Sequence, residues 1–135
     1  MGTIAISGSA SGIGAATRAM LDANGHTIIG IDLRDAEVIA DLTTDEGRHS
    51  AVTEVIARCD GVLDGLVSGA GLGPPVPAAM ITEVNYFGSQ ALLAGLRPAL
   101  AAAQGAAVVQ IGSNSSTITP NLPDELVDAF LAHDR

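Results

Sequence analysis

The chain has 135 residues, of which 47% are hydrophobic and only 2% aromatic, and it carries a net charge of −9 without any Lys/Arg cluster. Such an acidic chain, with almost no aromatic side chains to stack on bases, is not expected to bind nucleic acid. Its one cysteine excludes an internal disulfide, which favours a cytoplasmic protein, and no Cys/His spacing is typical of a zinc site. No apolar run reaches the roughly 18 residues that cross a bilayer. We therefore expect a cytoplasmic protein that binds neither metal nor membrane.

The N-terminal region has the pattern of a strand, a glycine-rich turn, a helix and a second strand. An apolar run from Thr3 to Ser7 leads into Gly8-Ser-Ala-Ser-Gly12-Ile-Gly14, and a helical pattern continues to Asn24 and Gly25. A second apolar run, from Thr27 to Ile31, ends at Asp32. In dinucleotide-binding folds an acidic residue at about this place holds the adenosine ribose. The pattern therefore predicts a dinucleotide-binding unit.

Each marked position of this unit has a physical task. Gly8 allows the chain to turn sharply out of the strand, Gly12 lets the backbone approach a pyrophosphate, and Gly14 lets the helix lie close to the strand. Unpaired N–H groups and the positive dipole end of the helix favour the same anion. Asp32 can accept hydrogen bonds from both ribose hydroxyls and would repel a 2′-phosphate. We therefore expect NAD rather than NADP, although Arg34 acts against this preference.

The rest of the chain alternates between strand and helix patterns, which predicts an α/β fold with a parallel sheet. A short third strand and an acidic helix capped by Thr43 or Thr44 precede a fourth strand and a glycine- and proline-rich loop. A long helix rich in Ala and Leu, interrupted by Pro98 and ended by Gly105, leads to a fifth strand, and a short helix begins after Pro123. The expected ranges, in chain order, are 37–42, 44–59, 65–68, 69–75, 81–104, 106–111 and 124–134.

Right-handed crossovers between these elements predict the strand order 3-2-1-4-5 in a Rossmann-like, doubly wound parallel sheet. No repeat or linker divides the chain, so residues 1–135 are expected to form a single domain. The fifth strand ends at Gly112 to Ser116, on the carboxyl edge of the sheet, where open α/β sheets place their chemistry.

Six segments are specific in combination: the glycine-rich turn, Asp32, Asp41-Leu42, Ser68-Gly69-Ala70-Gly71, Val84-Asn85-Tyr86-Phe87-Gly88 and Ile111-Gly112-Ser113. In this order they resemble the short-chain dehydrogenase/reductase family. Residues 25–42 look closer still to bacterial 3-alpha-hydroxysteroid dehydrogenase/carbonyl reductases. The resemblance covers about half of a typical relative, and it implies a sheet truncated before the sixth and seventh strands and an incomplete dinucleotide-binding domain.

The resemblance implies an oxidoreductase that transfers hydride between NAD and an alcohol or ketone, hydroxysteroid-like compounds among them, with NADP less favoured. Asp41 would bond the adenine amino group, and Leu42 would lie against the ring. Ser113 would hydrogen-bond the substrate carbonyl oxygen, and Asn85 would shape its helix and hold a proton-relay water. We also expect a homo-oligomer, because long apolar elements are normally covered on both faces. The implied cofactor contacts are Gly8, Ser11, Gly12, Ile13, Gly14, Asp32, Leu33, Asp41, Leu42, Ala70 and Gly71.

Two departures from the family pattern bear on function. Ser68-Gly69 stands where many relatives carry two asparagines. The Tyr-x-x-x-Lys pair that follows the catalytic serine in the family is absent, since the chain contains no lysine and its one tyrosine, Tyr86, has Gln90 four places on. We therefore interpret Tyr86 as a packing residue.

Three hypotheses follow. The chain is the cofactor-binding half of a longer oxidoreductase, a noncatalytic protein that binds a dinucleotide or a partner, or a subunit whose tyrosine and lysine are supplied by another chain. The first is favoured, because Ser113 is useful only beside a partner acid.

Overall fold

The computed structural model describes residues 1–133, which contain a sheet of five parallel strands in the order β3-β2-β1-β4-β5. In this sheet Ile4 lies opposite Ile28 on one side and Gly65 on the other. The predicted strand order and the Rossmann-like fold class are confirmed. The strands are β1 (Thr3–Ser7), β2 (Thr27–Asp32), β3 (Val38–Ile39), β4 (Gly65–Ser68) and β5 (Ala107–Gln110).

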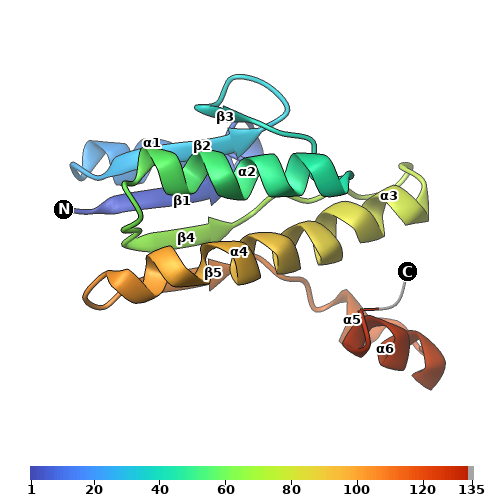
Figure 1. The fold of residues 1–135 in the computed structure, drawn as a ribbon. Coiled ribbons are helices and arrows are strands. Elements are labelled where there is room, and N and C mark those ends of the chain that lie inside the picture. The colour runs from blue at the N-terminus through green and yellow to red at the C-terminus, as the bar shows by residue number, and fades with distance from the viewer. Residues whose placement is uncertain (134–135) are drawn as a thin grey trace.

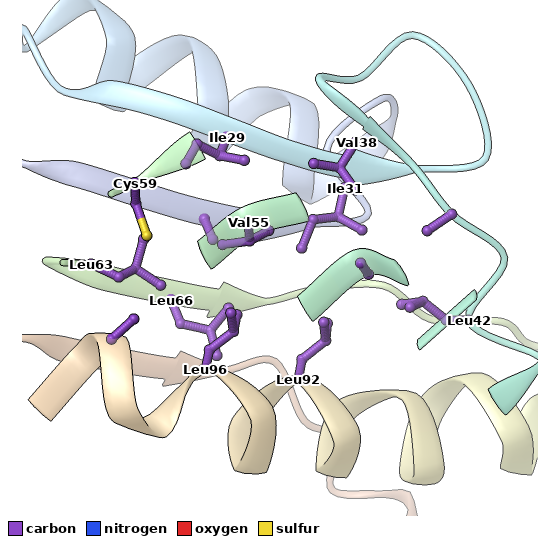
Figure 2. Packing of buried hydrophobic residues seen from close by; sticks show 14 residues of the cluster. Ile29, Ile31, Val38, Leu42, Val55, Cys59, Leu63, Leu66, Leu92 and Leu96 are labelled. Atoms are coloured by element: carbon purple, nitrogen blue, oxygen red, sulfur yellow. The ribbon is translucent and has the colours of Figure 1, made fainter. Parts of the chain in front are cut away.

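Helices cover both faces of the sheet. Figure 1 shows α2 (Asp45–Arg58) and α4 (Ser89–Ala102) side by side in front of the sheet and α1 (Gly12–Ala23) behind it. The main hydrophobic core lies between the sheet and the two front helices. In Figure 2, Leu92 and Leu96 of α4 point toward the strands, and both are fully buried. Because aliphatic side chains dominate this core, the scarcity of aromatic residues does not prevent it from closing.

The turn between β1 and α1 brings the helix unusually close to the strand. Gly8 has a φ of +75°, a conformation that residues with a side chain rarely adopt. A Cβ atom on Gly14 would lie 1.9 Å from the carbonyl oxygen of Gly8. No larger residue fits there without moving the helix away from the strand.

The third strand is shorter than the predicted range 37–42, since β3 contains two residues. The reason is that a side chain, instead of strand backbone, pairs with a backbone donor of β2. The Glu37 carboxylate accepts a hydrogen bond from the Gly30 N–H at 2.7 Å, and the Arg18 guanidinium of α1 donates to the same carboxylate. A carboxylate thus pairs this backbone donor of β2 just where the third strand was expected to begin.

The long helix predicted over 81–104 is built from three segments. They are α3 (Ala78–Thr82), the π-helical η1 (Glu83–Gly88) and α4. The expected interruption at Pro98 is wrong, because α4 continues through this proline. Proline removes a single backbone donor, whose acceptor would be the carbonyl of Ala94; Ala94 lies on the exposed side of α4. The change of helix geometry occurs instead in η1.

The C-terminal region contains two short helices, α5 (Ser115–Ile118) and α6 (Asp124–Leu131). Sequence analysis predicted the second, although Asp134, its expected end, lies outside the described residues. The first was not predicted from the sequence. In residues 1–133 no helix combines the length and the hydrophobicity needed to cross a membrane.

Replacing Leu92 by Ala should lower the free energy of unfolding by about 2–5 kcal/mol, because it leaves a cavity between α4 and the sheet. Urea denaturation followed by circular dichroism measures this change. Leu131→Ala is the matched control: its side chain is 73% exposed, so the free energy should change by less than about 0.5 kcal/mol. Equal effects of the two substitutions would contradict the packing described for α4.

Candidate functional site

A cleft of about 480 Å³ opens where β1, β2 and β4 end and their loops begin. Pockets that bind small molecules are typically about 300–1,000 Å³. The residues that sequence analysis selected as cofactor contacts are separated by up to 63 positions, yet all of them line this one cleft. They are Gly8, Ser11, Gly12, Ile13, Gly14, Asp32, Leu33, Asp41, Leu42, Ala70 and Gly71.

The floor of the cleft at β1 is the N-terminus of α1. Ser11 is the N-cap residue, but its side chain makes no capping hydrogen bond. The first N–H groups of a helix have no acceptor within the helix, so those of Gly12 and its neighbours are available to a ligand. A Cβ on Gly12 would meet no atom within 4 Å. This open, donor-rich helix end is suited to an anion such as a phosphate.

The Asp32 carboxylate joins the glycine-rich turn to the end of β2. Its Oδ2 accepts a hydrogen bond from the Ala10 N–H at 3.0 Å, and its Oδ1 accepts one from the Leu33 N–H at 2.7 Å. An ionised carboxylate offers about four acceptor positions. Asp32 can therefore hold the turn in place and still accept hydrogen bonds from hydroxyl groups in the cleft.

The far end of the cleft is formed by the loop between β3 and α2. Asp41 Oδ1 accepts hydrogen bonds from the Thr43 hydroxyl at 2.7 Å and from the Thr43 N–H at 2.9 Å. These two bonds, with a smaller contribution from the positive charge of Arg48, hold the pKa of the Asp41 carboxyl below its ordinary value of 3.8. Beside this charged group lies the apolar side chain of Leu42, which is 6% exposed.

Sequence analysis missed other residues that line the cleft. Three of them are apolar and four positions apart: Val76 in the turn before α3, Met80 in α3 and Val84 in η1. A spacing of four residues is typical of apolar side chains on one face of a helix. That spacing is the signal that could have identified them. The remaining lining residues are Ile31, Ala40, Thr43, Gly69 and Leu72.

Ser7 is a second omission, and it supports the cleft from beneath. It is 1% exposed, and its hydroxyl accepts hydrogen bonds from the N–H groups of Gly69 and Ala70 at 3.1 and 3.2 Å. The end of β1 is thereby tied to the loop that follows β4. A polar residue that ends an apolar strand just before Gly8 was the available signal.

Ser68, which stands where many relatives have asparagine, also forms buried contacts. Its hydroxyl lies 3.0 Å from that of Ser89 in α4, and Ser89 in turn accepts a hydrogen bond from the Gln110 side chain at 3.1 Å. A chain of polar groups therefore links β4, α4 and β5. This position has a structural role without an asparagine.

Neither residue selected as catalytic lines the cleft. The Asn85 side chain accepts from the Leu72 N–H at 2.8 Å and donates to the Leu72 carbonyl at 3.0 Å, which fixes the loop above the cleft. Ser113 is exposed beyond β5, and its hydroxyl accepts a hydrogen bond from the Ser115 N–H at 3.1 Å. That bond uses an acceptor position and leaves the hydroxyl proton free to donate.

Tyr86 packs in the interface between η1 and α6, as expected. Its ring centroid lies 4.7 Å from that of Phe130, and its hydroxyl donates to the Phe130 carbonyl and lies 3.2 Å from His133 Nδ1. Within residues 1–133, no group of three His, Cys, Asp or Glu side chains is arranged to hold a metal ion.

Taken together, the cleft offers three kinds of contact in a row. The helix end at Gly12 suits a phosphate, Asp32 suits vicinal hydroxyls, and the pair of Asp41 and Leu42 suits a flat base that carries an amino group. This donor set fits the phosphate, ribose and adenine parts of a dinucleotide.

No protein-family model matches the chain. The 3-alpha-hydroxysteroid dehydrogenase/carbonyl reductase of Comamonas testosteroni is 52% identical over 117 residues, which are 86% of this chain and 46% of that protein. A coniferyl-alcohol dehydrogenase of a Pseudomonas strain is 32% identical over 120 residues, 82% of this chain and 43% of that protein. The chain thus spans about half the length of these relatives.

Solved structures agree with this similarity. The 3-alpha-hydroxysteroid dehydrogenase of Pseudomonas sp. B-0831, crystallised with NADH, superposes with a TM-score of 0.92 at 50% sequence identity. The superposed region includes 98% of this chain and 52% of that enzyme. A short-chain dehydrogenase/reductase of Brucella ovis has a TM-score of 0.69 at 25% identity, covering 79% of this chain and 59% of its own. The resemblance to the short-chain dehydrogenase/reductase family is confirmed over about half the length of its members.

Replacing Thr43 by Val should raise the pKa of the Asp41 carboxyl toward 3.8, because it removes the hydrogen bond that contributes most to the lowered value. A carboxyl whose pKa is lowered by folding stabilises the fold at pH values above about 4, and that contribution disappears as the pH falls through the folded-state pKa. The substitution should therefore reduce this contribution. Carbon NMR of the side-chain carboxyl, recorded against pH, measures the shift.

Thr53→Val is the control, since the Thr53 hydroxyl donates to the His49 carbonyl and not to Asp41. An Asp41 titration that is the same in Thr43→Val as in the wild type would show that these hydrogen bonds do not hold the loop in solution.

Proposed function

We propose that this chain is the cofactor-binding half of an NAD-dependent oxidoreductase of the short-chain dehydrogenase/reductase type. The observation that carries the proposal is the convergence of the glycine-rich turn, Asp32, Asp41-Leu42 and Ala70-Gly71 on one cleft. The similarity to a hydroxysteroid dehydrogenase crystallised with NADH supports the choice of cofactor. Residues 1–135 would form a single cofactor-binding domain.

Each part of the cleft would bind a different part of the cofactor. The N–H groups at the start of α1 would bind the pyrophosphate, and Asp32 would accept hydrogen bonds from the adenosine ribose. Asp41 would accept a hydrogen bond from the adenine amino group while Leu42 lies against the ring. The backbone of Ala70-Gly71 would run beside the nicotinamide ribose. The bound nicotinamide would supply or accept the hydride.

The substrate would be an alcohol or ketone, a class supported by the names of the two sequence relatives. Ser113 would donate a hydrogen bond from its hydroxyl group to the substrate carbonyl oxygen and stabilise the charge that develops there. Asn85 would act through the loop that it holds at Leu72. Proton transfer to the carbonyl oxygen also needs an acid, which the Tyr-x-x-x-Lys pair supplies in the family and which this chain does not contain.

Two further features are part of this proposal. Homo-oligomer formation is supported by the exposed apolar side chains of β5 and α6, among them Val108, Val109 and Leu131. A cytoplasmic location is supported by Cys59, which is free and buried.

The wild-type chain should bind NADH at least tenfold more tightly than NADPH, a difference of about 1.4 kcal/mol, because Asp32 repels a 2′-phosphate. In Asp32→Asn the ratio of the two dissociation constants should fall toward one. Asn keeps only one of the two backbone hydrogen bonds, so both affinities are expected to weaken, and the ratio is the informative quantity. Calorimetric titration with each cofactor provides it.

Asp60→Asn is the matched control, since it removes the same charge from an exposed side chain that does not line the cleft. Its ratio should equal that of the wild type. A wild-type chain that binds NADPH as tightly as NADH would refute the role given to Asp32.

The noncatalytic alternative is distinguished by activity. The 135-residue chain should bind NADH without oxidising alcohols at a useful rate, because it lacks a positioned acid whose contribution is typically about 10²–10⁴-fold. A longer gene product that carries Tyr-x-x-x-Lys should transfer hydride, and Ser113→Ala in it should lower kcat by about 10²–10³-fold with little change in NAD affinity. Absorbance at the nicotinamide band follows the reaction.

Ser115→Ala in the longer product serves as the control, because the Ser115 contact to Ser113 is made by its backbone N–H. Hydride transfer by the purified 135-residue chain would instead require another acid, with Tyr86 as the first candidate. A longer product that binds NADH but remains inactive with alcohols and ketones would favour the noncatalytic alternative.

A further inference from the structure

Arg48 is a buried cation that lies behind the cleft without lining it. Its side chain is 4% exposed. Nη1 donates to the Leu42 carbonyl at 2.6 Å and to the Glu83 carbonyl at 3.2 Å. Nη2 donates to Asp45 Oδ1 at 3.0 Å and to Glu83 Oε2 at 2.8 Å. One side chain of α2 therefore joins the loop after β3, the first turn of α2 and the start of η1.

Stability alone does not account for a charge at this position. Removing an ion from water carries a large cost, and a well-packed apolar side chain often stabilises a fold as well as a buried ion pair does. What the guanidinium adds is geometry, because its planar, rigid set of donors accepts partners only in fixed directions. Two of the contacts of Arg48 are made to backbone carbonyl oxygens, whose positions they define.

The two backbones that Arg48 joins each carry a residue that lines the cleft, so each segment contributes one of its walls. Leu42 lines the cleft from the loop, and Val84, the residue after Glu83, lines it from η1. These segments approach each other closely elsewhere too, since a Cβ on Gly88 would lie 3.3 Å from Leu42 Cβ. The separation of the two walls is therefore set by the Arg48 hydrogen bonds together with this contact.

We propose that Arg48 is a positioning residue for the adenine end of the cleft, which holds Asp41 and Leu42 at a fixed distance from Val84 and so makes the site selective for adenine. The inference rests on the proposed dinucleotide-binding function and extends it. Asp41 accepts a hydrogen bond from the 6-amino group of adenine only while the loop keeps this distance. Hypoxanthine presents a 6-oxo group, an acceptor that a carboxylate cannot pair with.

The test compares NADH with its hypoxanthine analogue, nicotinamide hypoxanthine dinucleotide in the reduced form. The variants are Arg48→Met, which removes the charge and all donors, and Glu83→Gln, which keeps an acceptor but removes its charge. Arg58→Met is the matched control, since Arg58 lies on the same helix, is 47% exposed and has a nitrogen 3.9 Å from Glu54. Fluorescence titration gives both dissociation constants, and urea denaturation establishes that each variant is folded.

The wild type and Arg58→Met should bind NADH about tenfold more tightly than the analogue, as expected when a buried hydrogen bond is made to one base and not to the other. Arg48→Met should lose about tenfold in NADH affinity and little in analogue affinity, so that the selectivity falls toward one. Glu83→Gln should reduce the selectivity less, by about threefold. If Arg48→Met does not fold, Glu83→Gln alone decides.

Unchanged selectivity in the folded variants would overturn the inference, and so would equal losses of affinity for both dinucleotides, which a merely structural role predicts. A wild-type chain that binds NADH without preferring it to the analogue also overturns it while leaving the proposed function intact. A wild-type chain that binds neither dinucleotide refutes the proposed function itself.

Discussion

The cleft depends on how closely α1 approaches the end of β1. At Gly14 the helix passes so near the Gly8 carbonyl that only a hydrogen atom fits between them. This approach places the unpaired N–H groups of the helix at the carboxyl edge of the sheet, where the ends of β2 and β4 also lie. Asp32 then fixes the turn from the neighbouring strand through Ala10. If the helix lay farther out, the phosphate-binding donors and the carboxylates would no longer share one cavity.

Polar side chains that form hydrogen bonds to other segments fix the position of the other walls of the cleft. The core itself consists of aliphatic residues, which pack without a strong preference for direction. Ser7 joins β1 to the loop after β4, and Ser89 joins β4 to β5. Asn85 fixes the loop at Leu72, and Arg48 bridges three segments. The contacts of Ser7, Asn85 and Arg48 reach segments that line the cleft, so these directional contacts are concentrated where the geometry matters.

The sequence was informative wherever a local rule applies. Apolar runs identified β1, β2 and β4 to within a residue, and strand alternation with right-handed crossovers was enough for the sheet order. It was less informative where a distant side chain replaces backbone pairing. Glu37 shortened β3 by accepting a hydrogen bond from Gly30, and the role of Arg48 was not predictable because its partners include backbone carbonyls in two other segments. The predicted cofactor contacts do share one cleft, whereas the apolar residues that line it from α3 and η1 were not predicted, although their spacing of four residues is present in the sequence.

The π-helical turn has a consequence for how this segment can vary. In an α-helix each residue turns by about 100°, so steps of four residues drift by about 40° each. Val84, Gly88, Leu92 and Leu96 are four apart, and all are buried. The wider turn of η1 opposes that drift and keeps the row in phase. Loss of a single residue here would restore an ordinary helix, while the side chains before and after the turn would keep their directions. A one-residue gap in this stretch is therefore compatible with an unchanged side-chain phase on both sides, and sequence alignments of related chains should allow for it.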